Sequence, residues 1–107
     1  MVDPAVTPDL AITTDSAPFR RLLQATADTS AIVVIGFIED DDGALFNSAA
    51  VLRHGRLVGI YRKAYLLPGD AEVFRPGTDT PIFHAAPLRF GINICNDLNF
   101  PDAAARV

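Results

Sequence analysis

The most pronounced hydrophobic pattern in the chain is an uninterrupted apolar run, Ala31–Ile38. It is rich in β-branched residues, apolar on both faces, and too short for a typical helix. These properties predict a central strand that is covered on both sides. The acidic run that follows, Glu39–Gly43, ends in a glycine with a permissive backbone and predicts a reversal of the chain.

Two more strands are predicted directly after this reversal. They are Phe46–Arg53 and Leu57–Arg62, and the intervening His54-Gly55 predicts a tight turn between them. Residues 31–62 are therefore expected to form a β-meander.

A helix is predicted before the first strand. Asp15 and Ser16 are suitable N-caps, and Pro18 is compatible with the first helical turn, where backbone amides have no helical partners. Residues at i, i+3, i+4 and i+7 then form one mostly apolar face: Phe19, Leu22, Leu23 and Thr26. The helix is expected to end near Asp28, and residues 1–14 to form an irregular lead-in.

The second half of the chain predicts a long loop and short strands. Two Pro-Gly pairs indicate an ordered loop over residues 64–80. Strands are expected at 82–85 and 88–95, and a helix begins at Phe100, about one turn before the sequence stops. The elements indicate an α/β fold. Because short helices need packing to persist, the pattern predicts a fragment of a larger protein.

Composition narrows the class of protein. The 107 residues are 50% hydrophobic and 21% charged, with a net charge of −4, which is typical of one small globular domain spanning 1–107. An acidic balance argues against nucleic-acid binding. The apolar run is far shorter than the roughly 20 residues that span a bilayer, which argues against a membrane partner. A lone cysteine and an N-terminus without a signal-peptide pattern predict a cytoplasmic protein.

Cys95 is the first candidate for chemistry. It lies where an apolar strand gives way to a polar turn and a helix, a junction that can expose a nucleophile beside backbone N–H groups. The alternative is a buried core cysteine. Asp97, two residues later, is either part of the site or a helix cap.

Lys63 and the acids after it are the next candidates. Lys63 ends the third predicted strand, where it is either a solvated surface residue or a fixed positive charge that stabilises a tetrahedral intermediate. Glu72 is a candidate base or orienting acceptor. Neither His54 nor His84 has a Cys or His at metal-ligand spacing, so no metal site is expected, although a Cys–His pair stays possible.

In combination, four ordered blocks resemble the carbon–nitrogen hydrolase (nitrilase) superfamily: Val34-Ile-Gly-Phe37, Phe46-Asn-Ser-Ala-Ala50, Gly59-Ile-Tyr-Arg-Lys63 and Gly91-Ile-Asn-Ile-Cys-Asn-Asp97 followed by Phe100-Pro101. A Glu-x-Phe-x-Pro-Gly loop lies between the last two. The resemblance implies part of an αββα sandwich and a thiol-dependent hydrolysis of small amides, nitriles or carbamoyl compounds. It implies no metal or organic cofactor, and a homo-oligomer assembled through the sandwich helices.

The resemblance also implies roles for individual residues. Cys95 corresponds to the nucleophile that forms an acyl-thioester, and Lys63 to the cation that stabilises the oxyanion with the backbone N–H of Asn96. Glu72 corresponds to a second acid that positions substrate or lysine, and the alternative for this role is Asp70, two residues earlier in the same loop. Asn96 stands where an aromatic residue is frequent, so the motif resembles amidase and carbamoylase branches more than true nitrilases.

One expected catalytic group is absent from this sequence. The family's general base is a Glu well before the Val34 block, yet the two glutamates here are Glu39 and Glu72. The resemblance therefore predicts an amidase fragment that is inactive alone. The alternatives are a true nitrilase and a non-catalytic, truncated paralogue that acts as a binding or assembly module.

Overall fold

The computed structural model describes residues 7–94 of the chain. Its elements, in order, are α1 (Thr7–Leu10), α2 (Ala17–Ala25), β1 (Val33–Asp41), β2 (Ala44–Arg53), β3 (Arg56–Arg62), the 3-10 helix η1 (Asp70–Glu72), β4 (Phe83–Ala85) and β5 (Leu88–Phe90). The helix predicted from Phe100, together with Cys95 and Asn96, lies outside the described residues.

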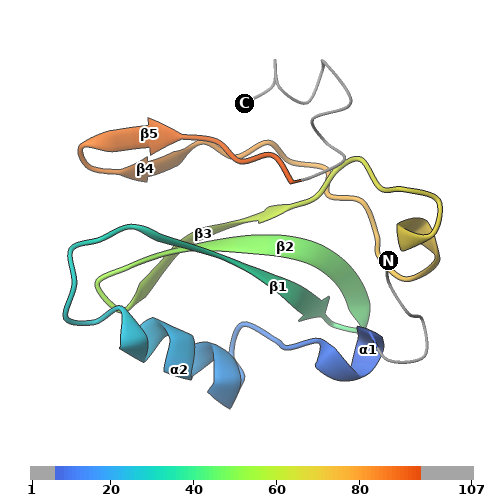
Figure 1. The fold of residues 1–107 in the computed structure, drawn as a ribbon, viewed down its shortest axis with the longest axis horizontal. Coiled ribbons are helices and arrows are strands. Elements are labelled where there is room, and N and C mark those ends of the chain that lie inside the picture. The colour runs from blue at the N-terminus through green and yellow to red at the C-terminus, as the bar shows by residue number, and fades with distance from the viewer. Residues whose placement is uncertain (1–6, 95–107) are drawn as a thin grey trace.

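The predicted β-meander is confirmed. Strands β1, β2 and β3 form an antiparallel sheet in that order (Figure 1). Two-residue turns join them, and all four turn residues have positive φ: Asp42 (52°), Gly43 (91°), His54 (52°) and Gly55 (74°). Such a backbone matches the right-handed twist of paired strands, which explains why short Asp-Gly and His-Gly sequences suffice here.

The prediction that 31–38 is the covered central strand is wrong for the described sheet. The central strand is β2, whose Ser48–Leu52 segment is buried throughout. Strand β1 lies at the edge, and Val34 is 50% exposed. An apolar run reports how hydrophobic a strand is, whereas its place in the sheet depends on which strands pair with its two edges.

Strand β1 also extends three residues beyond its apolar run. Its acidic end pairs in register with β2, with Glu39 opposite Phe46 and Asp41 opposite Ala44. The reversal is therefore confined to Asp42-Gly43. A carboxylate is tolerated within the sheet at Glu39 because an arginine from β3 binds it, as described below.

The helix α2 begins and ends close to its predicted limits. The Ser16 hydroxyl accepts a hydrogen bond from the Phe19 N–H at 3.4 Å, as an N-cap does. At the other end, the Thr26 hydroxyl donates to the Leu23 carbonyl and accepts from the Gly55 N–H at 3.0 Å. Thr26 therefore joins the end of the helix to the β2–β3 turn.

The described part of the predicted lead-in, residues 7–14, is more ordered than expected. It contains α1, and Ile12 forms a parallel bridge with Glu39 on β1. The Ile12 N–H donates to the Ile38 carbonyl, and the Asp40 N–H donates to the Ile12 carbonyl, each at 2.9 Å. These bonds hold the backbone on both sides of Glu39.

The two faces of the sheet are covered differently. Helix α2 packs on one face, where its Phe19 forms a buried cluster with Ala50 and Leu52 of β2. The β4–β5 hairpin packs on the other, where Phe83 joins Val51 and Tyr61 (Figure 1). The chain thus has a mixed α/β fold of layers with antiparallel sheets, as predicted.

The hairpin face has one close contact that was not predicted and one strand that is shorter than predicted. A Cβ on Gly59 would come within 2.7 Å of Phe83 Cε1, so glycine at this position allows the hairpin to approach β3. The strand predicted over 88–95 ends at Phe90, and the described residues after it are irregular. Ile92 and Ile94 still pack against the Val51–Tyr61 cluster.

Candidate functional site

Lys63 occupies the first position after β3 and is held through its backbone. Its N–H donates to the Asn47 carbonyl, and its carbonyl accepts from the Gly77 N–H, both at 2.9 Å. The residue is only 3% exposed. Lys63 is therefore a buried amine at a fixed place, not a solvated surface lysine.

Asp70 provides a counter-charge for this amine. Lys63 Nζ lies 3.4 Å from Asp70 Oδ2, and the Asp70 side chain is 17% exposed. Burying an ammonium is costly unless an acceptor compensates its lost hydration. Asp70 lies on η1, seven residues after Lys63, so the counter-charge of Lys63 comes from the loop that directly follows it.

Glu72 lies on the same short helix but is exposed to solvent. Of the two acids that the sequence offers, the structure brings Asp70 to Lys63. The two-residue spacing on a 3-10 helix places Asp70 and Glu72 on different sides of it, because one turn takes three residues.

The loop that carries Asp70 is anchored at its far end. Phe74 is buried, and the Arg75 N–H donates to the Leu45 carbonyl at 2.7 Å. At Gly77, a Cβ would approach the Arg62 carbonyl oxygen to 2.2 Å, so only glycine fits. The Phe-x-Pro-Gly sequence is thus the segment that returns the loop to the strands.

An ion pair that was not predicted from the sequence involves Arg62, the residue before Lys63. Arg62 donates from Nε to Glu39 Oε1 at 2.9 Å and from Nη2 to Glu39 Oε2 at 2.8 Å. The Ser48 hydroxyl also donates to Glu39 Oε1 at 2.8 Å, and Asp41 accepts from Nη2 at 2.9 Å. The guanidinium carbon lies 3.9 Å from the Phe46 ring centroid.

The ion pair affects the pKa of Arg62, and its two side chains differ in their exposure to solvent. The hydrogen bond to Glu39 raises the pKa of Arg62 further above its usual range, and Asp41 adds to the effect against partial burial. The Glu39 side chain is only 6% exposed, whereas that of Arg62 is 33% exposed. The sequence signal was available, since alternation places Glu39 on the same face as Ile35 and Phe37.

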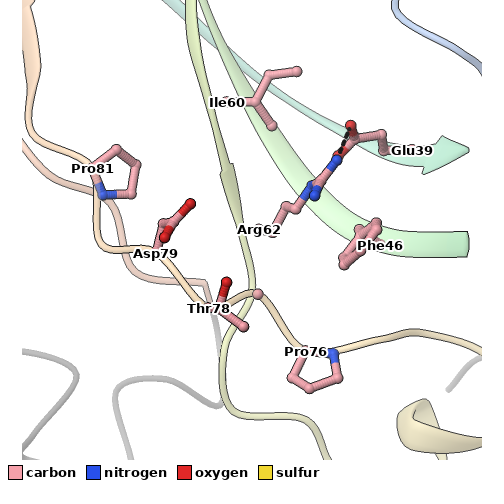
Figure 2. Close-up of a pocket in the computed structure, with 9 residues that line it drawn as sticks. Glu39, Phe46, Ile60, Arg62, Pro76, Thr78, Asp79 and Pro81 are labelled. Carbon is pink, nitrogen blue, oxygen red and sulfur yellow. Dashed lines mark hydrogen bonds and ion pairs between the residues drawn. The ribbon is translucent and has the colours of Figure 1, made fainter. Parts of the chain in front are cut away.

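A cavity of about 270 Å³ adjoins this pair. Figure 2 shows Arg62 reaching Glu39 on one side, with Phe46 nearby and the segment Pro76–Pro81 opposite. The cavity lies on the Arg62 side of β3. By strand alternation, Lys63 follows on the other side, with Tyr61.

The described residues leading to Cys95 lie on that same side. Ile92 and Ile94 pack against the cluster that contains Tyr61 and Val51. Cys95 itself and Asn96 lie outside the described residues.

The two histidines are placed away from Lys63 along β3. His54 lies in the turn at the opposite end of this strand, and His84 lies on β4. Both line a shallow groove with Arg53 and Arg56. Within residues 7–94, no group of three or more His, Cys, Asp or Glu side chains is arranged to hold a metal ion. None of the helices in that range has the length and apolar character to cross a membrane.

Comparisons with known proteins agree with this architecture. A family model described as carbon–nitrogen hydrolase matches residues 2–107. Over 103 residues the chain is 34% identical to a citrullinase from Francisella tularensis subsp. tularensis, covering 90% of this chain and 36% of that protein. It is 31% identical to an (R)-stereoselective amidase from Pseudomonas sp, covering 79% and 31%.

The fold is also found among solved structures. A CN-hydrolase superfamily protein from Xanthomonas campestris, which carries an arsenic adduct in its active site, superposes with a TM-score of 0.81 at 17% identity. That match covers 94% of this chain and 38% of the other. The chain therefore spans about a third of the length of these relatives.

Proposed function

Because the chain belongs to the carbon–nitrogen hydrolase family, we propose that it carries part of the active site of a thiol-dependent amidase. The reaction is hydrolysis of a non-peptide C–N bond in a small amide, through an acyl-thioester. The observation that carries the proposal is the buried Lys63 ammonium, paired with Asp70 at the end of β3. A cation kept out of water at a fixed position is suited to stabilise a developing oxyanion.

In the proposed reaction the Cys95 thiolate attacks the amide carbon, and the carbonyl π electrons move onto oxygen. Lys63 and the Asn96 N–H stabilise that oxyanion. The C–N bond then breaks, and the nitrogen leaves as ammonia or an amine after taking a proton. Water attacks the thioester, releases the carboxylic acid and regenerates the thiol. No metal or organic cofactor takes part.

The second acid in this proposal is Asp70, with Glu72 as the weaker candidate. Support comes from the 3.4 Å approach of Asp70 to Lys63 and from the exposure of Glu72. A carboxylate in this place orients the ammonium and offsets its burial.

The general base is proposed to come from outside these 107 residues. Glu39 is already bound by Arg62 and Ser48, and Glu72 is exposed. Removing a general base typically lowers the rate by about 10²–10⁴-fold. We therefore expect the 107-residue chain alone to be inactive.

We also propose that the protein is cytoplasmic. In addition, we propose that it forms a homo-oligomer, and light scattering of the purified chain tests this proposed oligomer.

Alkylation of the single cysteine tests the proposal. We define the labelling midpoint as the pH at which the iodoacetamide reaction reaches half of its maximal rate. A nearby ammonium favours the thiolate, so the midpoint is expected below the ordinary value of about 8.5 and is expected to rise in Lys63→Met. An inert thiol, or equal midpoints in both proteins, contradicts the site and favours a non-catalytic module.

Hydrolysis assays then separate the two enzymatic readings. They require the chain within a protein that also supplies the base. Release of ammonia from small amides, with no turnover of the matching nitriles, is the expected result. The reverse preference identifies a nitrilase.

A further inference from the structure

The ion pair between Arg62 and Glu39 holds the residue that precedes Lys63. Arg62 makes a two-point contact with a carboxylate that is itself held by Ser48. On the other side of Glu39, the Ile12 bridge holds the backbone of the flanking residues. The guanidinium is thus bound to a group that has little freedom of its own.

The loop that bears Asp70 rests on the same arginine. The backbone of Gly77 lies directly against the Arg62 carbonyl, and its N–H donates to the Lys63 carbonyl. A rotation of the end of β3 would therefore move the Lys63 side chain and, at the same time, disturb the contacts of Gly77 with Arg62 and Lys63.

The chemistry of the pair points beyond fold stability. Replacing a buried ion pair with apolar residues is often neutral or stabilising, so such a pair is weak evidence of a stabilising role. A bidentate guanidinium–carboxylate contact does, however, fix orientation, because two parallel hydrogen bonds define the plane of the side chain.

We propose that Glu39 and Arg62 are positioning residues, which fix the rotation of the β3 end and thereby the direction of the Lys63 ammonium beside Asp70. This inference rests on the proposed function of Lys63. Arg62 and Lys63 point to opposite faces of the strand, so the pair acts through the backbone and does not touch the substrate.

The test uses the labelling midpoint of Cys95, the only cysteine in the full chain. Glu39→Gln and Arg62→Gln are each expected to raise the midpoint by about one pH unit, which slows labelling at pH 7 by about tenfold. Circular dichroism of each variant verifies that it remains folded. A purely structural role would leave the midpoint of a folded variant unchanged.

The signs of the two shifts separate positioning from direct electrostatics. If the charges acted on the thiol only through space, Glu39→Gln would lower the midpoint and Arg62→Gln would raise it. Shifts in opposite directions, or no shift in folded variants, overturn the proposal. Shifts upward in both variants support it.

Two further variants complete the experiment. Arg53→Gln is the control, since it also removes one arginine charge but does so at the end of β2 that is next to the β2–β3 turn. Arg53 donates there to the Ser30 and Ala86 carbonyls. The labelling midpoint of this variant is expected to match that of the wild type. Arg62→Lys keeps the charge but loses the bidentate contact. If Glu39→Gln does not fold, the Arg62→Lys variant tests the positioning role in its place. A raised labelling midpoint in Arg62→Lys supports that role, and an unchanged midpoint overturns it.

Failure of this inference is distinguishable from failure of the proposed function. If Lys63→Met labels like wild type, the role of Lys63 is wrong, and the positioning role falls with it. If Lys63→Met raises the midpoint while folded Glu39→Gln and Arg62→Gln do not, only the positioning role is wrong.

Discussion

Gly77 donates its backbone N–H to the Lys63 carbonyl at 2.9 Å, at a position where no larger residue fits. One residue before Lys63, the Arg62 carbonyl oxygen would lie 2.2 Å from a Cβ at position 77. The Pro-Gly sequence therefore marks the place where a long loop closes on the strand that carries the candidate catalytic lysine.

The first prediction concerns this closure. Gly77→Ala is expected to lower the free energy of unfolding by about 1–3 kcal/mol, because the clash is with backbone and forces a shift. Urea unfolding measures it. Gly69→Ala is the matched control, since Gly69 has open space around its Cβ position and φ of −65°. It is expected to change stability by less than about 0.5 kcal/mol. Equal effects would show that the close approach at Gly77 is not rigid.

The second prediction distinguishes the two acids of the loop. Asp70→Asn is expected to destabilise the chain by about 1–3 kcal/mol, because it leaves the buried Lys63 ammonium without its counter-charge. Glu72→Gln is expected to stay within about 0.5 kcal/mol, since Glu72 is exposed. Thermal or urea unfolding compares the two isosteric variants. The opposite order would assign the acid role to Glu72.

The third prediction compares the two acids bound by Arg62. Glu39→Gln is expected to cost about 1–3 kcal/mol of unfolding free energy, because it weakens a bidentate contact to a buried carboxylate. Asp41→Asn is expected to cost less than about 0.5 kcal/mol, because that side chain is 56% exposed. Repeating the measurement at 1 M salt should reduce the Asp41 effect and leave most of the Glu39 effect. Similar losses at both positions would be inconsistent with this assignment.

The fourth prediction concerns the contact between the sheet and the hairpin. Gly59→Ala is expected to destabilise the chain by about 1–3 kcal/mol, because its Cβ would meet Phe83 at 2.7 Å. Phe83→Leu alone is also expected to be destabilising. The double variant is expected to be more stable than the sum of the single effects predicts, because the smaller leucine relieves the clash. Strict additivity would show that the two positions do not contact in solution.

The sequence predicted what local signals determine. Both turns of the meander were predicted from short Gly-containing sequences, and the helix from its cap and apolar face. Those features depend on residues within a few positions of one another. The match to residues 2–107 confirms the family to which the motifs pointed.

What escaped prediction depends on contacts between distant segments. The Glu39–Arg62 pair joins residues 23 positions apart. The sequence assigned Glu39 to the acidic chain reversal and not to the sheet, so its pairing with an arginine was not predicted. The choice between Asp70 and Glu72 required the direction of each side chain on η1, which a spacing of two residues does not supply.

The loop between Lys63 and Gly77 is fastened to the strands at both of its ends, while its tip is not. Leu67 is 49% exposed, and Pro68 and Gly69 are exposed beside it. Lengthening a loop at such a tip costs little chain entropy, since each doubling in length adds only about 0.6 kcal/mol. Insertions there would leave the backbone hydrogen bonds of Lys63 to Asn47 and Gly77 in place, so the loop can vary in length while the strand end that carries the amine keeps its support.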